Sequence, residues 1–224
     1  MQLRVKGAES RWQAAAAVVV ALVLYVTLPP KVIVGPVWVL PVAVLVILVP
    51  LLVLAPHRHR EARWQRWLSI AHIAVLSAFN IGTIVLLFVW QVSEHYRKHF
   101  SGEELLVAAV QIWLTNVIVY ALWFWEIDGR GPEPRAHTTV ENDARRSDFL
   151  FPQMTLEPRT RAEMNWKPQF LDYVFLSFTN ATAFSPTDTF PLTRTAKMLM
   201  MAEAMKSLVT IAIIAARGIG ILGT

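Results

Sequence analysis

The chain has 224 residues, of which 55% are apolar and only 17% are Asp, Glu, Lys or Arg. An average soluble domain carries about 25% charged residues, so this composition argues against a soluble globular protein. It also argues against disorder, which needs low hydrophobicity and high charge. Cysteine is absent, which excludes disulfides and cysteine nucleophiles. The net charge of +5 fits contact with anionic lipid, so we expect a lipid bilayer and no nucleic acid as partner.

Residues 1–127 contain four apolar blocks of membrane-spanning length. A helix needs about 20 apolar residues to cross about 30 Å of hydrocarbon. The blocks are too long for strands and lack strict alternation, so they predict four transmembrane helices. Pro29 and Pro30 separate the first two blocks and predict a turn. The blocks are Trp12–Leu28, Ile33–Leu54, Trp67–Val92 and Leu105–Trp125.

Residues 128–168 form a second region, which is polar and rich in Pro and Arg. An aqueous loop of about 40 residues exceeds the usual length of a structureless connection, so we expect it to be functional, partly folded or mobile. Phe149, Leu150, Phe151 and Pro152 are apolar enough to dock on the membrane surface or on the helices.

Residues 169–224 form the last region. Gln169–Phe184 is an apolar, aromatic stretch of about 16 residues, which predicts a re-entrant helix that stops midway or a short crossing. Pro186 ends it, and Leu192–Leu222 predicts a final transmembrane helix. The expected fold class is therefore an all-α polytopic membrane protein with four transmembrane helices, a polar loop, a re-entrant or short spanning helix and a last transmembrane helix.

Two charged residues interrupt the final apolar stretch. Glu203 and Lys206 are three apart and share a helix face, so they can form an ion pair. Charges at membrane depth usually face a bundle interior or a water-filled cavity. We expect this pair to line a pore or to be a structural ion pair.

No motif predicts an enzyme. Gly218, Gly220 and Gly223 match a dinucleotide-binding pattern, but a membrane helix precedes them and nothing follows to supply the acidic residue. His57 and His59 lack a third ligand, so we expect no metal site and no cofactor.

The C-terminal region resembles the pore module of two-helix potassium channels. In that family an aromatic pore helix leads to a Thr-Val-Gly-Tyr-Gly-Asp filter, and a Pro, a Thr and the inner helix follow. Here an aromatic run, Asp172–Thr179, precedes Thr182, and Asp188, Pro191 and Thr193 stand at the matching offsets. The resemblance covers about a quarter of the chain. It implies an ion channel built from a symmetric oligomer, with a tetramer as the natural guess.

Most of the chain is also similar to an uncharacterised bacterial family of multi-span membrane proteins, the DUF1345-like proteins. The segments that carry this likeness are Trp123–Pro132 and Asp148–Met154. This likeness implies a multi-pass protein of the cell membrane, which in bacteria is the inner membrane. It does not imply any particular activity.

The filter-like segment departs from the potassium-channel pattern. Ser185 and Thr187 replace the two filter glycines, which are needed where the backbone visits positive φ. We therefore expect a shorter or wider filter that favours monovalent cations without strict potassium selectivity, and Asp188 could supply a ring of negative charge. The filter-like residues are Thr182, Ala183, Phe184, Ser185, Pro186, Thr187 and Asp188.

Charge counting and the channel resemblance predict opposite orientations. Lys and Arg are concentrated before the first block and after the second, which predicts that the N-terminus and the 128–168 loop lie inside the cell. A potassium-channel pore helix enters from outside. A full crossing by Gln169–Phe184 is a third solution.

Two other functions are open. One is a small-molecule or lipid-binding membrane protein or transporter without a shared pore, whose site would use the intramembrane polar side chains His72, Asn80, Gln111, Asn116, Asp172 and Asn180. The other is a scaffold whose polar loop, Asp128–Pro168, binds a soluble partner.

Overall fold

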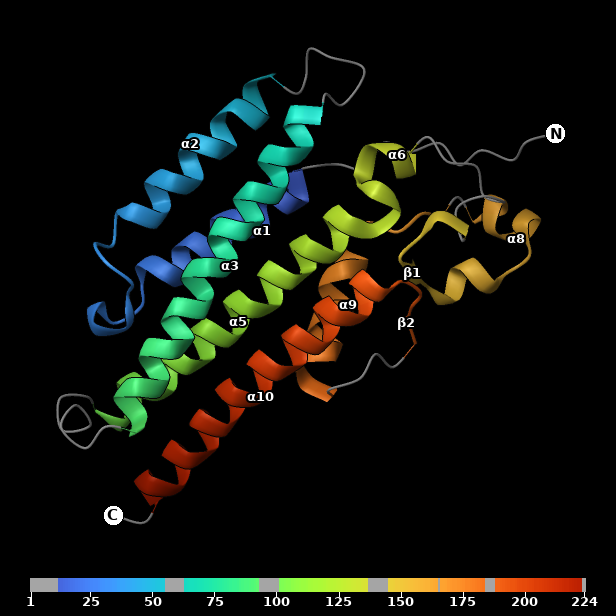
Figure 1. Cartoon of the computed structure of the whole chain (residues 1–224). Coiled ribbons are helices and arrows are strands. Elements are labelled where there is room, and N and C mark those ends of the chain that lie inside the picture. The colour runs from blue at the N-terminus through green and yellow to red at the C-terminus, as the bar shows by residue number, and fades with distance from the viewer. Residues whose placement is uncertain are drawn as a thin grey trace.

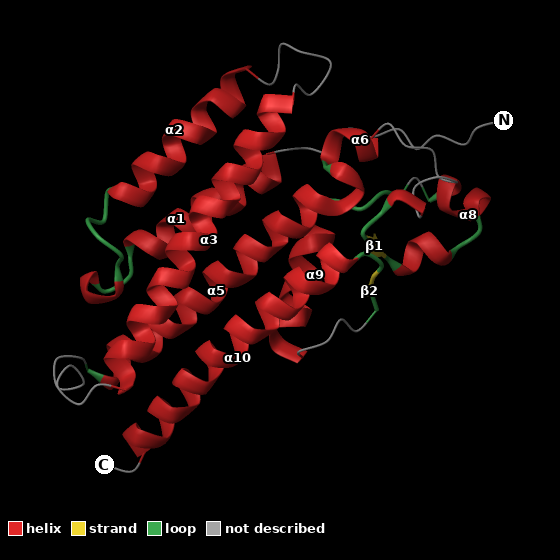
Figure 2. Cartoon of the chain, viewed as in Figure 1, coloured by secondary structure: helices red, strands yellow, loops and turns green. Residues whose placement is uncertain are grey.

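The computed structural model describes residues 12–54, 63–92, 101–136, 145–164, 166–183 and 188–222, and these residues are almost all helical (Figure 2). The main helices are α1 (Trp12–Val26), α2 (Val39–Leu54), α3 (Arg63–Val92), α5 (Gly102–Ile127), α9 (Phe170–Ala183) and α10 (Arg194–Leu222). The long helices run roughly side by side (Figure 1).

Three of the described helices, α3, α5 and α10, are long and apolar enough to cross a membrane. The chain therefore has the character of a membrane protein. The first two helices, α1 with 15 residues and α2 with 16, are shorter than the roughly 20 residues that a full crossing needs. The predicted turn between them is confirmed, because a 3-10 helix at Pro30–Val32 connects them.

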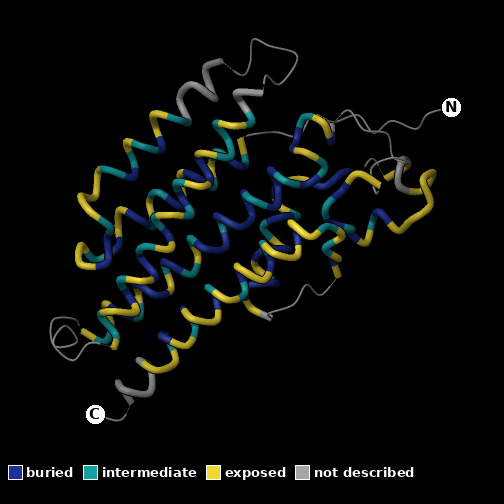
Figure 3. Tube along the Cα trace, in the orientation of Figure 1, coloured by how far each residue is buried: buried dark blue, intermediate teal, exposed yellow. Residues whose placement is uncertain are grey.

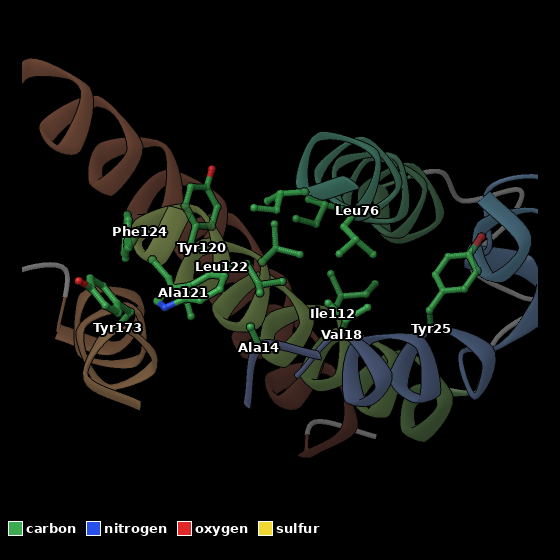
Figure 4. Packing of buried hydrophobic residues seen from close by; sticks show 14 of the residues in the cluster. Ala14, Val18, Tyr25, Leu76, Ile112, Tyr120, Ala121, Leu122, Phe124 and Tyr173 are labelled. Atoms are coloured by element: carbon green, nitrogen blue, oxygen red, sulfur yellow. The ribbon is translucent and has the colours of Figure 1, made fainter. Parts of the chain in front are cut away.

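Helix α5 is the centre of the bundle and packs against α10, α9, α3 and α1. Its buried face includes Ala108, Ala109 and Ala121, which are fully buried. Small side chains let membrane helices approach closely. Figure 4 shows Ile112 of α5 meeting Val18 of α1 and Leu76 of α3, and Figure 3 shows exposed residues along α10 and α2.

The described part of the 128–168 region is folded over the end of α5. It contains a 3-10 helix at Asp128–Arg130, α6 (Pro132–Ala136), β1 (Phe149–Leu150), a 3-10 helix at Pro152–Thr155 and α8 (Pro158–Glu163). Phe149 is fully buried, and its ring lies 5.0 Å from that of Phe124 in α5. The apolar Phe149–Phe151 segment thus docks on the helices.

Helix α9 spans only about half the length of α5. It begins beside the C-terminal end of α5, where the rings of Phe170 and Trp125 lie 5.9 Å apart. Its other end reaches the middle of α5, where Phe178 contacts Trp113 at 5.7 Å. The chain then returns to the level at which α9 began, because β2 (Phe190–Pro191) pairs antiparallel with β1. With 14 residues, α9 is about 21 Å long.

Candidate functional site

A polar cluster lies in the core between α5, α9 and α10, and Glu203 of α10 is at its centre. Glu203 is fully buried. Its Oε2 accepts a hydrogen bond from Asn180 Nδ2 at 2.7 Å, and its Oε1 is hydrogen-bonded to Ser177 Oγ. Ser177 Oγ also contacts the carbonyl oxygen of Val117 in α5 at 2.7 Å. One acidic side chain therefore joins three helices.

Lys206 lies one turn further along α10 and has different neighbours. Its Nζ donates to Asn80 Oδ1 in α3 at 3.1 Å and lies 4.5 Å from the centre of the Tyr120 ring. Among the residues that the structure describes, no direct ion pair joins Lys206 to Glu203. Lys206 instead connects α10 to α3 by its hydrogen bond to Asn80 and to α5 by its cation–π contact with Tyr120.

The structure brings together part of the polar set that the sequence singled out. Asn80, Asn116 and Asn180 all lie in this core, and Asn116 Nδ2 donates to Ser207 Oγ at 3.1 Å. The other members lie elsewhere. Gln111 donates to the hydroxyl of Thr27, the residue that follows α1, and Asp172 accepts from the backbone N–H of Gln169 at the start of α9.

His72 of α3 is also buried, and its two ring nitrogens make no hydrogen bond to any residue described. Within the same described ranges, no three His, Asp or Glu side chains gather as a metal site. His57 and His59 lie outside the described residues.

The filter-like residues follow the half-length helix. Thr182 is exposed, and its hydroxyl donates back to the carbonyl of Phe178. Ala183 ends α9, residues 184–187 lie outside the described residues, and Asp188 is exposed where the chain returns toward β2. Neither Thr182 nor Asp188 belongs to the buried polar cluster.

A second polar cluster, at the C-terminal end of α5, has Asp128 at its centre. Asp128 is fully buried; its Oδ1 accepts from the backbone N–H groups of Asp148 at 2.6 Å and Phe149 at 3.2 Å, and Tyr173 of α9 donates to its Oδ2 at 2.6 Å. The buried guanidinium of Arg135 donates to the carbonyls of Trp125 and Asp128. Since Arg135 donates hydrogen bonds to carbonyl oxygens at the end of α5, this cluster has a structural role and holds the polar loop against that end of the helix.

Sequence reasoning missed Ser177, Ser207 and the whole Asp128 cluster. A signal for Ser177 was present, because Ser177 and Asn180 are three residues apart and share one face of α9. The Asp128 cluster also joins the two segments, Trp123–Pro132 and Asp148–Met154, that carried the broader family likeness.

Comparison with family models, with curated proteins and with solved structures finds no match.

Proposed function

We propose that this chain is one subunit of a pore-loop-like cation channel formed by a symmetric homo-oligomer, with a tetramer as the expected assembly. The observation that carries the proposal is the course of the chain around α9. This helix ends beside the middle of α5, and the chain returns to the level of its start before α10 begins. In a bilayer this course corresponds to a re-entrant helix.

The electrostatics of α9 support the same proposal. The C-terminal end of a helix carries a partial negative charge, and in a re-entrant helix it points toward the bilayer centre, where it stabilises a cation. Asp188 adds a full negative charge on the returning segment and is exposed in the single chain. In a symmetric assembly, copies of Asp188 would form a ring that attracts cations.

The proposed selectivity is for monovalent cations in general. Ser185 and Thr187 stand where a potassium filter has glycines, and residues with a Cβ adopt positive φ only at a cost. Hydroxyl and carboxylate oxygens, including those of Thr182 and Asp188, would then contribute to coordination.

A flux assay in liposomes tests the proposal. Purified wild-type protein should release a monovalent-cation gradient, and Asp188→Asn should reduce the flux because it removes the ring of charge. Glu157→Gln is the matched control, since Glu157 is exposed in the polar loop and lies outside the returning segment. Absence of flux from a protein that is monomeric in detergent would refute the channel.

The buried polar cluster favours one alternative, a transporter that binds its substrate within a single chain. Asn80, Asn116, Asn180, Glu203 and Lys206 meet inside one chain, as transport sites in helical bundles do. Under this alternative, Asn180→Ala abolishes uptake, Asp188→Asn leaves it unchanged, and the monomer remains active.

A further inference from the structure

We propose that Glu203 binds a proton within the helix bundle and that this proton joins α9 to α5 and α10. The number of hydrogens available to the contacting oxygen atoms points to this proton, whether or not the chain conducts ions or forms an oligomer.

Ser177 Oγ contacts two acceptors at once. One is the carbonyl oxygen of Val117, at 2.7 Å, and the other is Oε1 of Glu203. A serine hydroxyl has a single hydrogen, and a carbonyl oxygen can only accept. If that hydrogen points to Val117, the contact with Glu203 needs a second hydrogen, which the carboxyl group must supply. If it points to Glu203, Ser177 Oγ and the Val117 oxygen face each other without a hydrogen.

Asn180 does not supply the missing hydrogen. Its Nδ2 contacts the carbonyl oxygen of Met200 at 3.0 Å and Oε2 of Glu203 at 2.7 Å. An amide nitrogen has two hydrogens, and these two contacts use both. The Met200 oxygen also fixes the orientation of the amide, because only the nitrogen can face a carbonyl. Every polar contact of Glu203 is satisfied when its Oε1 carries a proton and donates to Ser177.

The surroundings of Glu203 favour the neutral form as well. The side chain is fully buried, and an ionised carboxylate loses much more hydration on burial than a carboxylic acid. Among the described residues, two titratable side chains lie near this carboxyl group, Lys206 on α10 and Tyr120 on α5. The positive charge of Lys206 favours the ionised form, but its direct contacts are with Asn80 and the Tyr120 ring and not with the carboxyl group. Helix α9 presents only neutral groups to the carboxyl, Ser177 and Asn180.

The proton has a structural consequence. With it, the carboxyl group joins Ser177 and Asn180 of α9 to α10, and Ser177 continues the connection to α5. Without it, the oxygens of Val117 and Glu203 compete for the single hydrogen of Ser177, so one of these two contacts is lost and the docking of α9 against α5 or α10 is weakened. We therefore assign Glu203 as a proton-binding group that controls the docking of the half-length helix.

Infrared spectroscopy of the full-length protein in lipid tests the proton directly. At neutral pH the wild type should show the C=O band of a protonated carboxylic acid, which is absent in Glu203→Gln and present in the control Glu103→Gln, where the acid is exposed. The glutamine amide can donate to Ser177 and accept from Asn180, so this variant should fold. Ser177→Ala keeps the acid and should shift its band. Spectra that are identical for the wild type, Glu203→Gln and Ser177→Ala would overturn the assignment.

Hydrogen exchange of the backbone amides of α9 tests the structural consequence. Exchange should be equal in the wild type and Glu203→Gln at low pH. As the pH rises, the wild type should exchange faster than the variant, by up to about tenfold per pH unit, because one proton is lost when α9 separates. A ratio that stays constant across the pH range would refute the role of the proton in docking. Both experiments report on Glu203 even in a protein that conducts no ions.

Discussion

Asp128 is the residue whose replacement should be most costly outside the helix core. Its carboxylate is fully buried and accepts three hydrogen bonds, two of them from the backbone N–H groups of Asp148 and Phe149. Asp128→Ala should lower the free energy of unfolding by about 3 kcal/mol, because each unsatisfied buried donor costs about 1–3 kcal/mol. Tyr173→Phe removes the hydrogen bond that the Tyr173 hydroxyl donates to Asp128 and should cost about 1 kcal/mol. Thermal unfolding in detergent measures the loss of stability in both variants. Equal losses for Asp128→Ala and Tyr173→Phe would contradict the role assigned to the Asp128 carboxylate.

Gly129 stands at a position that requires glycine, and Gly35 provides a matched comparison. Gly129 has φ of +57°, and an added Cβ would lie 2.7 Å from Cγ of Arg135. Gly35 has φ of +71°, but an added Cβ there meets no atom within 4 Å. Gly35→Ala should therefore cost only backbone strain, about 1 kcal/mol, whereas Gly129→Ala should cost more because it also displaces Arg135. The melting temperatures of the two variants test this difference. A smaller decrease in melting temperature for Gly129→Ala than for Gly35→Ala would refute the prediction.

The start of α10 depends on a single side chain, that of Thr193. Its Oγ1 donates to Asp148 Oδ1 at 2.6 Å and accepts from the N–H of Ala196 at 3.3 Å, so it caps α10 and joins it to the polar loop. Thr193→Val keeps the shape and loses both bonds, and it should destabilise the protein by about 1–2 kcal/mol. Thr193→Ser keeps both and should lie near the wild type. Chemical unfolding of Thr193→Val and Thr193→Ser measures this difference. Equal unfolding midpoints for the two variants would contradict a capping role for Thr193.

The lengths of the elements could be predicted from sequence better than their contacts. The apolar run up to Phe184 and the proline after it predicted a short helix, and α9 ends at Ala183. The partners of that helix could not be predicted, because Ser177 meets Val117 across 60 positions and Glu203 across 26. The burial of Trp125 at the end of α5 could not be predicted either, because it depends on Phe170, which packs against its ring.

The bundle as a whole combines a polar cluster inside its hydrophobic core with an apolar outer surface. Met198, Met201, Met205 and Leu208 of α10 are exposed, whereas Glu203 and Ser207 of the same helix are fully buried. A soluble helix bundle has the reverse distribution, with its polar side chains facing water. The exposed apolar face of α10 is available for lipid or for a neighbouring subunit, and a pore-loop channel would need both kinds of contact.

Because the chain has no cysteine, single cysteines can establish the course of the whole molecule across the membrane. Glu103, Glu157 and Asp188 are exposed, and Glu103 lies at the opposite end of α5 from the polar loop that holds Glu157. If α9 is re-entrant, a membrane-impermeant thiol reagent applied to intact cells should label either Glu157→Cys and Asp188→Cys together or Glu103→Cys alone, and permeabilising the cells should make the remaining positions reactive. Labelling of Asp188→Cys together with Glu103→Cys would mean that α9 crosses the membrane fully, and the pore-loop proposal would fail. The side on which Glu157→Cys reacts also decides between the two predicted orientations: the cytoplasm agrees with the charge count, and the outside agrees with a pore helix that enters as in potassium channels.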